Sequence, residues 1–518
     1  MAITDFFDRG RRQNRHGIAY IGAETSWTFD EAGALSCRVA HALLAEGFAR
    51  EAKAAVLAPN DPVAWICVLG IWRAGLAWVP LNPAGSAEDV RALLDGFDCE
   101  VLFYHSSLAA TVDALRPHLD GVRRYVCLDA AHGGTPSLAS WTAGRSEDPP
   151  AVAYDLDDVV AVSPTGGTTG RPKGVMNTHR SFQTAFAHMM LAFHYPADAP
   201  IVNLAAAPMT HAAGVLSMPA SARGGTVVIL PRPEPSALLT AIERHGVTEL
   251  FLPPTVIYRL LESPGIGARD LSSLRYLIYG AAPMSTGKLA RAIEVFGPVL
   301  IEGYGQMEAF AAISYLRPEE HFTGGRLAPE SRLGSCGRPY PLITVEIRGE
   351  DGRPVPPGVP GEICVRGDLV MKGYYRDPER TAETVVDGWL HTGDVGHLDE
   401  DGYLHITDRT KDMVISGGYN VFPSEVEQVL WKHPAVQDCA VVGVPHPEWG
   451  EAVHAVVELN PGGRVTAEEL IALCRNALGG VRAPKTVAFV DSLPRSANGK
   501  VLKKAVREPY WAGEKRRV

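Results

Sequence analysis

The chain has 518 residues and a formal net charge of −10 at pH 7, with 46% hydrophobic and 21% charged residues. A chain of this length exceeds what one hydrophobic core usually supports, so two or more domains are expected. The composition argues against disordered and fibrous classes of protein. The acidic balance argues against a nucleic-acid partner and against binding to anionic membranes.

The N-terminal residues 1–8 lack the basic start and the long apolar core of a signal peptide. No apolar run approaches the roughly 20 residues that a membrane span requires. The eight cysteines are scattered singly, without C-x-x-C pairs or the spacing of zinc ligands. These features predict a cytoplasmic protein with no membrane span.

Short apolar runs alternate with amphipathic segments between about residues 20 and 160. This alternation predicts right-handed βαβ units on a parallel sheet. The segment 129–150, rich in Gly, Ser, Ala and Pro, is expected to be a surface linker. The expected strands and helices are, in chain order, 54–58, 62–75, 77–80, 88–97 and 100–104.

An apolar run at 159–162 leads into Ser163-Pro-Thr-Gly-Gly-Thr-Thr-Gly-Arg-Pro-Lys-Gly174. Glycines let backbone N–H groups converge on an anion, and the hydroxyl groups and the lysine add donors suited to phosphate. A lone Gly-rich segment is more often a flexible turn, but the density of donors favours phosphate binding. The spacing is not that of the nucleoside-triphosphate P-loop. The candidate phosphate ligands are Thr165, Gly166, Gly167, Thr168, Thr169, Gly170 and Lys173.

The alternation resumes after this segment, and parallel sheets bind ligands at the carboxyl ends of their strands. The segments 163–174, 280–283 and 303–308 each follow a predicted strand, so we expect them to form one site. The expected elements are strands at 226–230, 247–252, 274–279 and 298–302 and helices at 235–245 and 285–296.

The pattern changes after about residue 330 to short strands punctuated by Gly and Pro, which predicts a small antiparallel β-subdomain. A compact α+β unit of about a hundred residues follows. The expected strands of the β-subdomain are 344–348, 361–366 and 403–407. The α+β unit is expected to contain helices at 424–432 and 467–477 and strands at 438–443, 452–458 and 486–490.

The segment 163–174 resembles the phosphate loop of the adenylate-forming superfamily, which includes acyl- and aryl-CoA ligases, carrier-protein adenylation domains and luciferases. Residues 302–308 resemble the Y-G-x-T-E motif of this family. The resemblance implies that Tyr304 stacks on adenine and that Glu308 helps to hold Mg²⁺, for which a carboxylate is suited. A tyrosine alone is more often a core aromatic residue. The other nucleotide-binding residues implied here are Gly280, Ala281, Ala282, Glu302 and Gly303.

Further motifs occur in the family's order along essentially the whole chain. Residues 208–214 are similar to a segment of the acyl pocket, where His211 would be a gate or a pocket wall, although a lone histidine is more often structural. Residues 388–394 and 406–412 match segments in which Asp394 and Arg409 would bind the ribose. Alone, these would be a turn aspartate and a surface arginine.

The C-terminal part carries two further matches. Lys411 falls at the family's hinge, and Gly417 and Gly418 belong to a loop that would pass close to a pantetheine arm. Residues 494–500 match the motif whose lysine, here Lys500, bridges the carboxylate and the α-phosphate. A cation at that place stabilises charge on the transferring phosphoryl group. A lysine in a basic terminal segment is otherwise usually solvated.

Two positions depart from the family pattern. Gly166 replaces a Ser or Thr, and Met307 replaces the threonine whose hydroxyl contacts the α-phosphate. These departures are compatible with an unaffected enzyme, with weakened adenylation, or with a chain that performs only the second half of the reaction.

We therefore predict an α/β protein with a large N-terminal domain of doubly wound sheets, 1–410, which includes a β-subdomain at about 330–410. A small mobile α+β domain, 411–518, is expected to follow the hinge at Lys411. The resemblance implies an ATP-dependent carboxylic acid:CoA ligase that uses ATP, Mg²⁺ and coenzyme A, forms an acyl-AMP intermediate and releases AMP. The alternatives are an enzyme that uses supplied acyl-AMP, one that loads a carrier protein, and a non-catalytic nucleotide or acyl sensor. The sequence leaves the identity of the small-molecule acid open.

Overall fold

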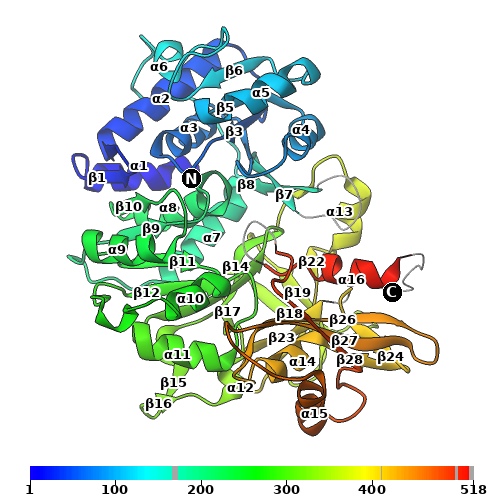
Figure 1. Ribbon diagram of the computed structural model, residues 1–518. Helices are drawn as coiled ribbons and strands as arrows, with labels where there is room; N and C mark the ends of the chain where they lie inside the picture. The colour runs from blue at the N-terminus through cyan, green and yellow to red at the C-terminus, as the bar shows by residue number, and fades with distance from the viewer. Residues whose placement is uncertain (166–172, 410, 496–499, 513–518) are drawn as a thin grey trace.

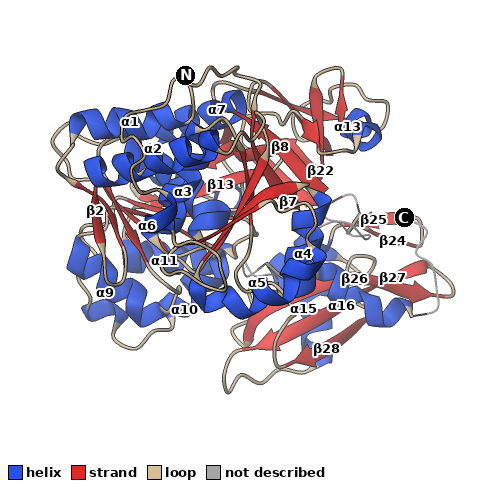
Figure 2. Ribbon diagram, turned by 90° about the horizontal axis from the view of Figure 1, so that it is seen from above, coloured by secondary structure: helices blue, strands red, loops and turns tan. Residues whose placement is uncertain are grey.

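The structure is a computed structural model that describes residues 1–165, 173–409, 411–495 and 500–512 (Figure 1). It contains two large sheets in the N-terminal four-fifths of the chain, two five-stranded sheets toward the C-terminus and a two-stranded sheet of β15 (Phe322–Thr323) and β16 (Arg326–Leu327). Figure 2 shows helices packed around the large sheets. Among the described residues, none of the helices combines the length and apolar character needed to cross a membrane.

The first large sheet confirms the predicted βαβ pattern, because β3, β4, β5, β6 and β7 pair in parallel. Its other edge is antiparallel, where β8 pairs with both β7 and β20. Its strands are, in spatial order, β20 (Gly373–Tyr374), β8 (Lys173–Thr178), β7 (Val159–Thr165), β4 (Ala77–Pro80), β3 (Lys53–Leu57), β5 (Cys99–Tyr104) and β6 (Arg124–Cys127). The helices associated with this region are α2 (Phe29–Ala45), α3 (Pro62–Arg73), α4 (Ala87–Gly96) and α5 (Ala109–Leu115).

The second large sheet has nine strands, of which β1, β10, β9, β11, β12 and β13 pair in parallel. Their order is β17 (Arg338–Pro339), β14 (Ala309–Leu316), β13 (Leu300–Gln306), β12 (Tyr276–Gly280), β11 (Glu249–Leu252), β9 (Val202–Ala205), β10 (Thr226–Ile229), β1 (Ile18–Ile21) and β2 (Ser26–Thr28). The helices of this region are α1 (Thr4–Gln13), α7 (His179–Ala192), α8 (Gly214–Ala222), α9 (Pro235–His245), α10 (Pro254–Leu261) and α11 (Thr286–Phe296).

The largest hydrophobic cluster joins residues of both large sheets with α1, α2, α3, α7 and α8. Helix α3 is buried along its whole length, as an apolar helix without a polar face must be. Trp65, Trp72 and Trp78 pack edge-to-face there, with ring centroids 5.4–5.9 Å apart. Asp61 caps α3 by accepting a hydrogen bond from the Val63 amide. This shared core fixes the two sheets relative to each other.

A third, antiparallel sheet corresponds to the predicted β-subdomain. It consists of β18 (Thr344–Arg348), β19 (Gly361–Arg366), β22 (Trp389–Leu398), β21 (Val385–Val386) and β23 (Leu404–Arg409). Helix α13 (Pro378–Thr384) precedes β21, and β20 leaves this region to pair with β8 of the first sheet. The third sheet is thereby tied to the predicted phosphate-binding segment.

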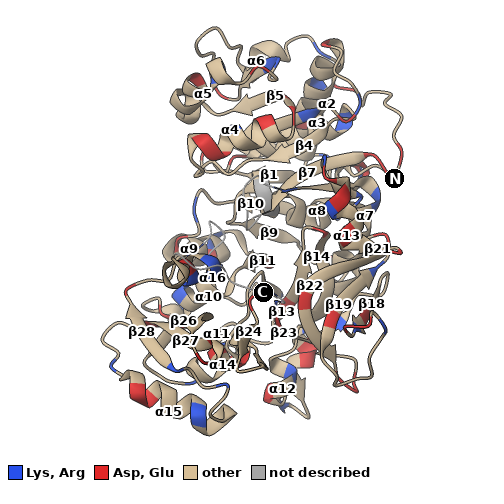
Figure 3. Cartoon of the chain, turned by 90° about the vertical axis from the view of Figure 1, so that its right-hand side faces the viewer, with Lys and Arg blue, Asp and Glu red and all other residues tan. Residues whose placement is uncertain are grey.

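The C-terminal region has the predicted α+β composition and its own apolar cluster. Its sheet consists of β25 (Tyr419–Val421), β24 (Val414–Ser416), β27 (Gly450–Leu459), β26 (Val436–His446) and β28 (Thr486–Val490). Its helices are α14 (Pro423–Leu430), α15 (Ala467–Leu478) and α16 (Lys503–Arg507). Figure 3 shows both acidic and basic positions on α15, whose buried Leu470 and Cys474 belong to this apolar cluster.

Three local expectations are wrong. The segment 129–150 is not simply a linker, because it contains α6 (Leu138–Trp141), and Trp141 packs on Phe103 and donates a hydrogen bond to Glu46. Lys173 does not lie in a loop but begins β8, which forms a hairpin with β7. Strand β13 continues to Gln306, so most of 303–308 belongs to the strand.

Candidate active site

A cavity of about 1540 Å³ is bordered by all the main parts of the chain. From the sequence-predicted residues it is lined by Thr165, Lys173, Ala281, Gly303, Glu308, Arg409, Lys411 and Lys500. The predicted site segments therefore border one space, although β7 belongs to a different sheet from β12 and β13.

Close backbone packing shapes the wall at the ends of β12 and β13. These strands pair in parallel, with Gly280 opposite Gly303. A Cβ atom at Gly280 would lie 2.3 Å from the carbonyl oxygen of Gly303, so only glycine allows this approach. The next residue, Ala281, has a φ of 65°, an uncommon conformation for a residue with a side chain. A small residue at this place leaves the cavity open above the strand ends.

Glu308 and Lys173 face the cavity on either side of Tyr374. The Tyr374 hydroxyl donates a 2.8 Å hydrogen bond to Oε1 of Glu308, and Nζ of Lys173 lies 5.3 Å from the centroid of the same ring. Desolvation and the nearby charges of Arg380 and Lys411 lower the pKa of Lys173. Cations gathered near one carboxylate can bind a polyanion, and the carboxylate can ligate a divalent cation.

Asp394 is nearly buried between two predicted partners. Its Oδ2 accepts a 2.7 Å hydrogen bond from the Tyr304 hydroxyl, and its Oδ1 accepts one of 3.0 Å from Nε of Arg409. Asp394 and Arg409 are opposite each other because β22 and β23 pair in antiparallel register. Burial and the charge of Asp394 hold the pKa of Tyr304 well above its usual range, so its hydroxyl is a hydrogen-bond donor. The two motifs therefore form one unit.

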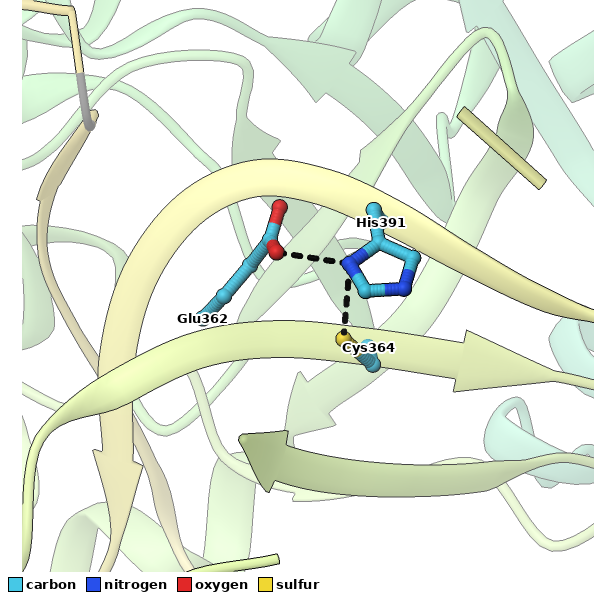
Figure 4. Close-up of side chains that lie close together, drawn as sticks. All are labelled: Glu362, Cys364 and His391. Carbon is cyan, nitrogen blue, oxygen red and sulfur yellow. Dashed lines mark hydrogen bonds and ion pairs between the residues drawn. The ribbon is translucent and has the colours of Figure 1, made fainter. Parts of the chain in front are cut away.

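Glu362, Cys364 and His391 support the irregular stretch of β22 just before Asp394 (Figure 4). Oε1 of Glu362 accepts a 3.0 Å hydrogen bond from the Gly393 amide, and Oε2 lies 2.7 Å from Nδ1 of His391. The Cys364 sulfur lies 3.6 Å from the same nitrogen. Burial raises the pKa of the Cys364 thiol to about 12, so the thiol stays protonated. The three potential ligand atoms lie within 4.8 Å of one another, but His391 Nδ1 serves both neighbours. We assign this cluster to holding the irregular stretch of β22.

Lys500 borders the cavity from the C-terminal region. Desolvation and the charge of Arg409 lower its pKa to about 8, against the opposing effects of Asp394 and Asp412. Lys500 as a whole residue is exposed, and it lies at the border of the cavity. A cation placed here can stabilise negative charge that develops on a bound phosphate.

Several predicted residues do not line the cavity. Gly417 and Gly418 form the turn of the β24–β25 hairpin with φ of 58° and 84°, and the Gly417 amide donates to the carbonyl oxygen of Trp449. Glu302 accepts a 3.2 Å hydrogen bond from the Tyr279 hydroxyl, and burial raises its pKa to about 8. Four other predicted residues are neighbours of lining residues in the chain but do not line the cavity themselves: Gly280, Ala282, Tyr304 and Asp394.

The segment Gly166, Gly167, Thr168, Thr169 and Gly170 lies outside the described residues. Its flanking residues, Thr165 and Lys173, are paired across the β7–β8 hairpin and both border the cavity. The side chain of His211 also lies outside the description, although Pro208 and Ala213 on either side line the cavity.

Met307, which departs from the family pattern, also lines the cavity. It packs partly against Val175, Met371 and Tyr374. The site thus has an apolar contact where the family pattern has a hydroxyl group.

Sequence reasoning missed Tyr374 and the pair Glu362 and His391. Tyr374 lies 66 residues from Glu308 in the chain, and Glu362 lies 29 residues from His391. No local motif links such positions, because strand pairing in the folded chain brings them together.

Comparisons with known proteins identify the family to which the chain is similar. Residues 6–375 match the AMP-binding enzyme family, and residues 425–500 match the AMP-binding enzyme C-terminal domain. The chain is 38% identical over 468 residues to a medium/long-chain fatty-acid–CoA ligase of Mycobacterium tuberculosis, covering 88% of this chain and 80% of that protein. It is 37% identical over 505 residues to a feruloyl-CoA synthase of an Amycolatopsis species, covering 97% and 98%.

The fold is also similar to that of the amide bond synthetase McbA of Marinactinospora thermotolerans. The TM-score is 0.89 at 34% sequence identity, covering 98% of this chain and all of that one (100%). The similarity extends over both the N-terminal and the C-terminal regions.

Proposed function

Because the chain belongs to the AMP-binding enzyme family, we propose that it is an ATP-dependent carboxylic acid:CoA ligase that acts through an acyl-AMP intermediate. Relatives named as a fatty-acid–CoA ligase and a feruloyl-CoA synthase support this reaction class. The observation that carries the proposal is the convergence of Lys500, Lys173 and Glu308 on one cavity.

The first step needs an anion-binding site with a cation near the reacting oxygens. In our proposal, the carboxylate of the acid attacks the α-phosphorus of ATP, the α–β phosphoric anhydride bond breaks, and pyrophosphate leaves. Lys173 and the segment 165–170 bind the departing phosphates, and Lys500 stabilises charge on the reacting oxygens. Glu308 would hold Mg²⁺, which neutralises phosphate charge when it is bound. The exposed rim and the carboxylate of Glu308 fit such a hard cation.

The nucleoside would lie near Asp394. Ala281, Tyr304 and Gly303 are proposed to contact adenine, while Asp394 and Arg409 bind the ribose. In the structure Asp394 is held by Tyr304 and Arg409, so its carboxylate is already oriented before the nucleotide binds. His211 is proposed to form part of the acyl pocket. Glu302 is proposed to belong to the nucleotide-binding site.

The second step requires a different arrangement of the C-terminal region. We propose that residues 411–518 rotate as a domain about Lys411, which withdraws Lys500 and brings Gly417 and Gly418 to the cavity. The thiol of coenzyme A then attacks the acyl carbon, the bond to AMP breaks, and AMP leaves. The position of the glycine pair outside the cavity while Lys500 borders it supports such an exchange.

The test is acid-dependent exchange of labelled pyrophosphate into ATP, followed by addition of coenzyme A. Exchange and thioester formation with one class of acid are the expected results. Met307 supports one second candidate, an enzyme limited to the second step, because its side chain supplies no hydroxyl group to the cavity. Absence of exchange, combined with thioester formation from supplied acyl-AMP, would favour that candidate.

The acyl acceptor is tested in the same assay. Coenzyme A is the proposed acceptor, and a pantetheinylated carrier protein or an amine replaces it in parallel reactions. Transfer only to the carrier protein or only to the amine would contradict the proposal.

All eight cysteines are buried free thiols, which supports a reducing compartment such as the cytoplasm.

A further inference from the structure

One face of the nine-stranded sheet continues from the reaction end of the cavity toward the amino ends of the strands. The register places Phe251 beside Ile278 and Ile278 beside Ile301, all on this face. Gly303 lies two residues beyond Ile301 on the same face, because side chains alternate along a strand. Residues Met189 and Phe193 of the α7 region and Leu216 of α8 also line this space. The cavity therefore includes an apolar channel suited to the body of an acid.

The channel ends at a polar side chain. Asn203 on β9 lines the cavity and lies opposite Glu249 on β11, on the same face. Nδ2 of Asn203 donates a 2.9 Å hydrogen bond to Oε1 of Glu249. Asn203 is 7% exposed and Glu249 is 1% exposed, so neither is an ordinary surface residue. A buried polar pair at the end of an apolar channel requires a chemical explanation.

Glu249 has a second hydrogen-bond partner. The Tyr195 hydroxyl donates a 2.7 Å hydrogen bond to the other carboxylate oxygen of Glu249. Glu249 and Tyr195 lie outside the set of described residues that line the cavity, so Asn203 alone presents this group to a ligand. The bond to Glu249 uses an N–H of Asn203, which leaves Oδ1 as an acceptor. Among the described residues, none donates a hydrogen bond to that oxygen.

The length of the channel follows from the strands. Tyr276 pairs with Glu249, and Gly280 pairs with Gly303 at the reaction end. The four residues from Tyr276 to Gly280 span about 13 Å along the strands at ~3.3 Å per residue. The sheet order β13, β12, β11 and β9 adds three strand spacings, about 14 Å across the sheet, so Gly303 and Asn203 lie about 19 Å apart. A long, extended acid with its carboxyl group at Gly303 would therefore bring its other end close to Asn203.

We propose that Asn203 determines substrate specificity by accepting a hydrogen bond from a hydroxyl group at the end of the acid remote from the carboxyl group. The predicted substrates are long-chain aliphatic acids with a hydroxyl group at the remote end. A site built to bind a hydroxyl group discriminates against the analogue that lacks it, because the acceptor is then left without a partner. This inference rests on the proposed acid:CoA ligase function.

The test compares pairs of acids that differ only in the hydroxyl group: 16-hydroxyhexadecanoic with hexadecanoic acid, and 12-hydroxydodecanoic with dodecanoic acid. The ratio of kcat/KM within a pair is measured for thioester formation. The unmodified enzyme is expected to favour the hydroxylated member of at least one pair by about tenfold or more. Asn203→Val is expected to bring this ratio close to one.

Tyr195→Phe is the matched control, because it removes the other hydrogen bond to Glu249 without changing the channel wall. It is expected to keep the ratio of the unmodified enzyme. Each ratio compares two acids on one preparation, so partial unfolding of a variant cancels.

Equal use of both members of each pair by the unmodified enzyme would overturn the inference and leave the ligase function intact. An unchanged ratio in Asn203→Val, or an equal change in Tyr195→Phe, would also overturn it. Absence of any acid-dependent pyrophosphate exchange and thioester formation would instead refute the proposed function itself.

Discussion

Tyr374 contacts both charged groups at one end of the cavity: its hydroxyl donates a 2.8 Å hydrogen bond to Glu308, and its ring lies 5.3 Å from Nζ of Lys173. The tyrosine comes from β20, a two-residue strand that pairs with β8, the strand that Lys173 begins. Strand pairing thus sets the distance between a cation proposed to bind phosphate and a carboxylate proposed to bind Mg²⁺.

Tyr374→Phe tests this relationship. Loss of one hydrogen bond, worth about 1 kcal/mol, leaves Glu308 less well oriented and should raise KM for MgATP about fivefold with a smaller effect on kcat. Steady-state kinetics with varied MgATP measure both constants. Tyr375→Phe is the control, because that hydroxyl binds Asp98 and the residue does not line the cavity. Equal KM values in the two variants would contradict the assignment.

The lowered pKa of Lys500 predicts a pH dependence of adenylation. The ammonium form is the catalytic form, so the rate of pyrophosphate exchange should fall as pH rises through about 8. The titration of Lys500 would not itself unfold the protein in this range. The folded pKa lies below the ordinary value of 10.5, so this group favours the folded state more as pH rises between about 8 and 10.5.

Lys500→Arg provides the comparison, since arginine keeps its charge throughout this range. The variant should have a lower exchange rate at pH 7 but should lose the decline that starts near pH 8. If the exchange rate of both enzymes declines equally at alkaline pH, a group other than Lys500 causes the decline.

Asp394→Asn should weaken nucleotide binding and stability together. The asparagine amide would keep the shape of the side chain but would lose its negative charge. The carboxylate of Asp394 pairs with Arg409 and accepts a hydrogen bond from the Tyr304 hydroxyl. We expect an increase in Kd for a non-hydrolysable ATP analogue of about tenfold or more and a loss of about 1–3 kcal/mol in stability. Calorimetric titration and thermal unfolding measure these changes. Asp399→Asn, which alters a more exposed pair with His405, should change neither by a comparable amount.

Lys503→Met should destabilise the C-terminal region. Nζ of Lys503 lies 2.8 Å from Oε1 of Glu427, whose side chain is 4% exposed, so the variant leaves a buried carboxylate without its cation. Breaking such a pair typically costs about 3–5 kcal/mol. Lys432→Met breaks the exposed pair with Glu330 and should cost less than about 1 kcal/mol. Thermal unfolding of both variants, followed by tryptophan fluorescence, gives the comparison, and similar melting temperatures would refute it.

Local patterns in the sequence are enough to predict many elements. The helix at 235–245 and the strands at 77–80, 344–348, 361–366 and 486–490 have the predicted bounds. Apolar periodicity and turn residues are patterns that extend over only a few residues, so they can be recognised in the sequence without knowledge of the fold. The motifs that identify the family are likewise contiguous stretches.

Contacts between distant segments could not be predicted in this way. The pairing of Asp394 with Arg409 depends on the register of β22 and β23, and Tyr374 reaches Glu308 only because β20 pairs with β8. The buried pair of Asn203 and Glu249 depends on the register of β9 and β11, 46 residues apart. The sequence by itself determined the reaction class and the candidate residues, because short motifs carry that chemistry. Tertiary structure alone decided which of these residues share the cavity and what closes its far end, because register and sheet packing place side chains that no local pattern connects.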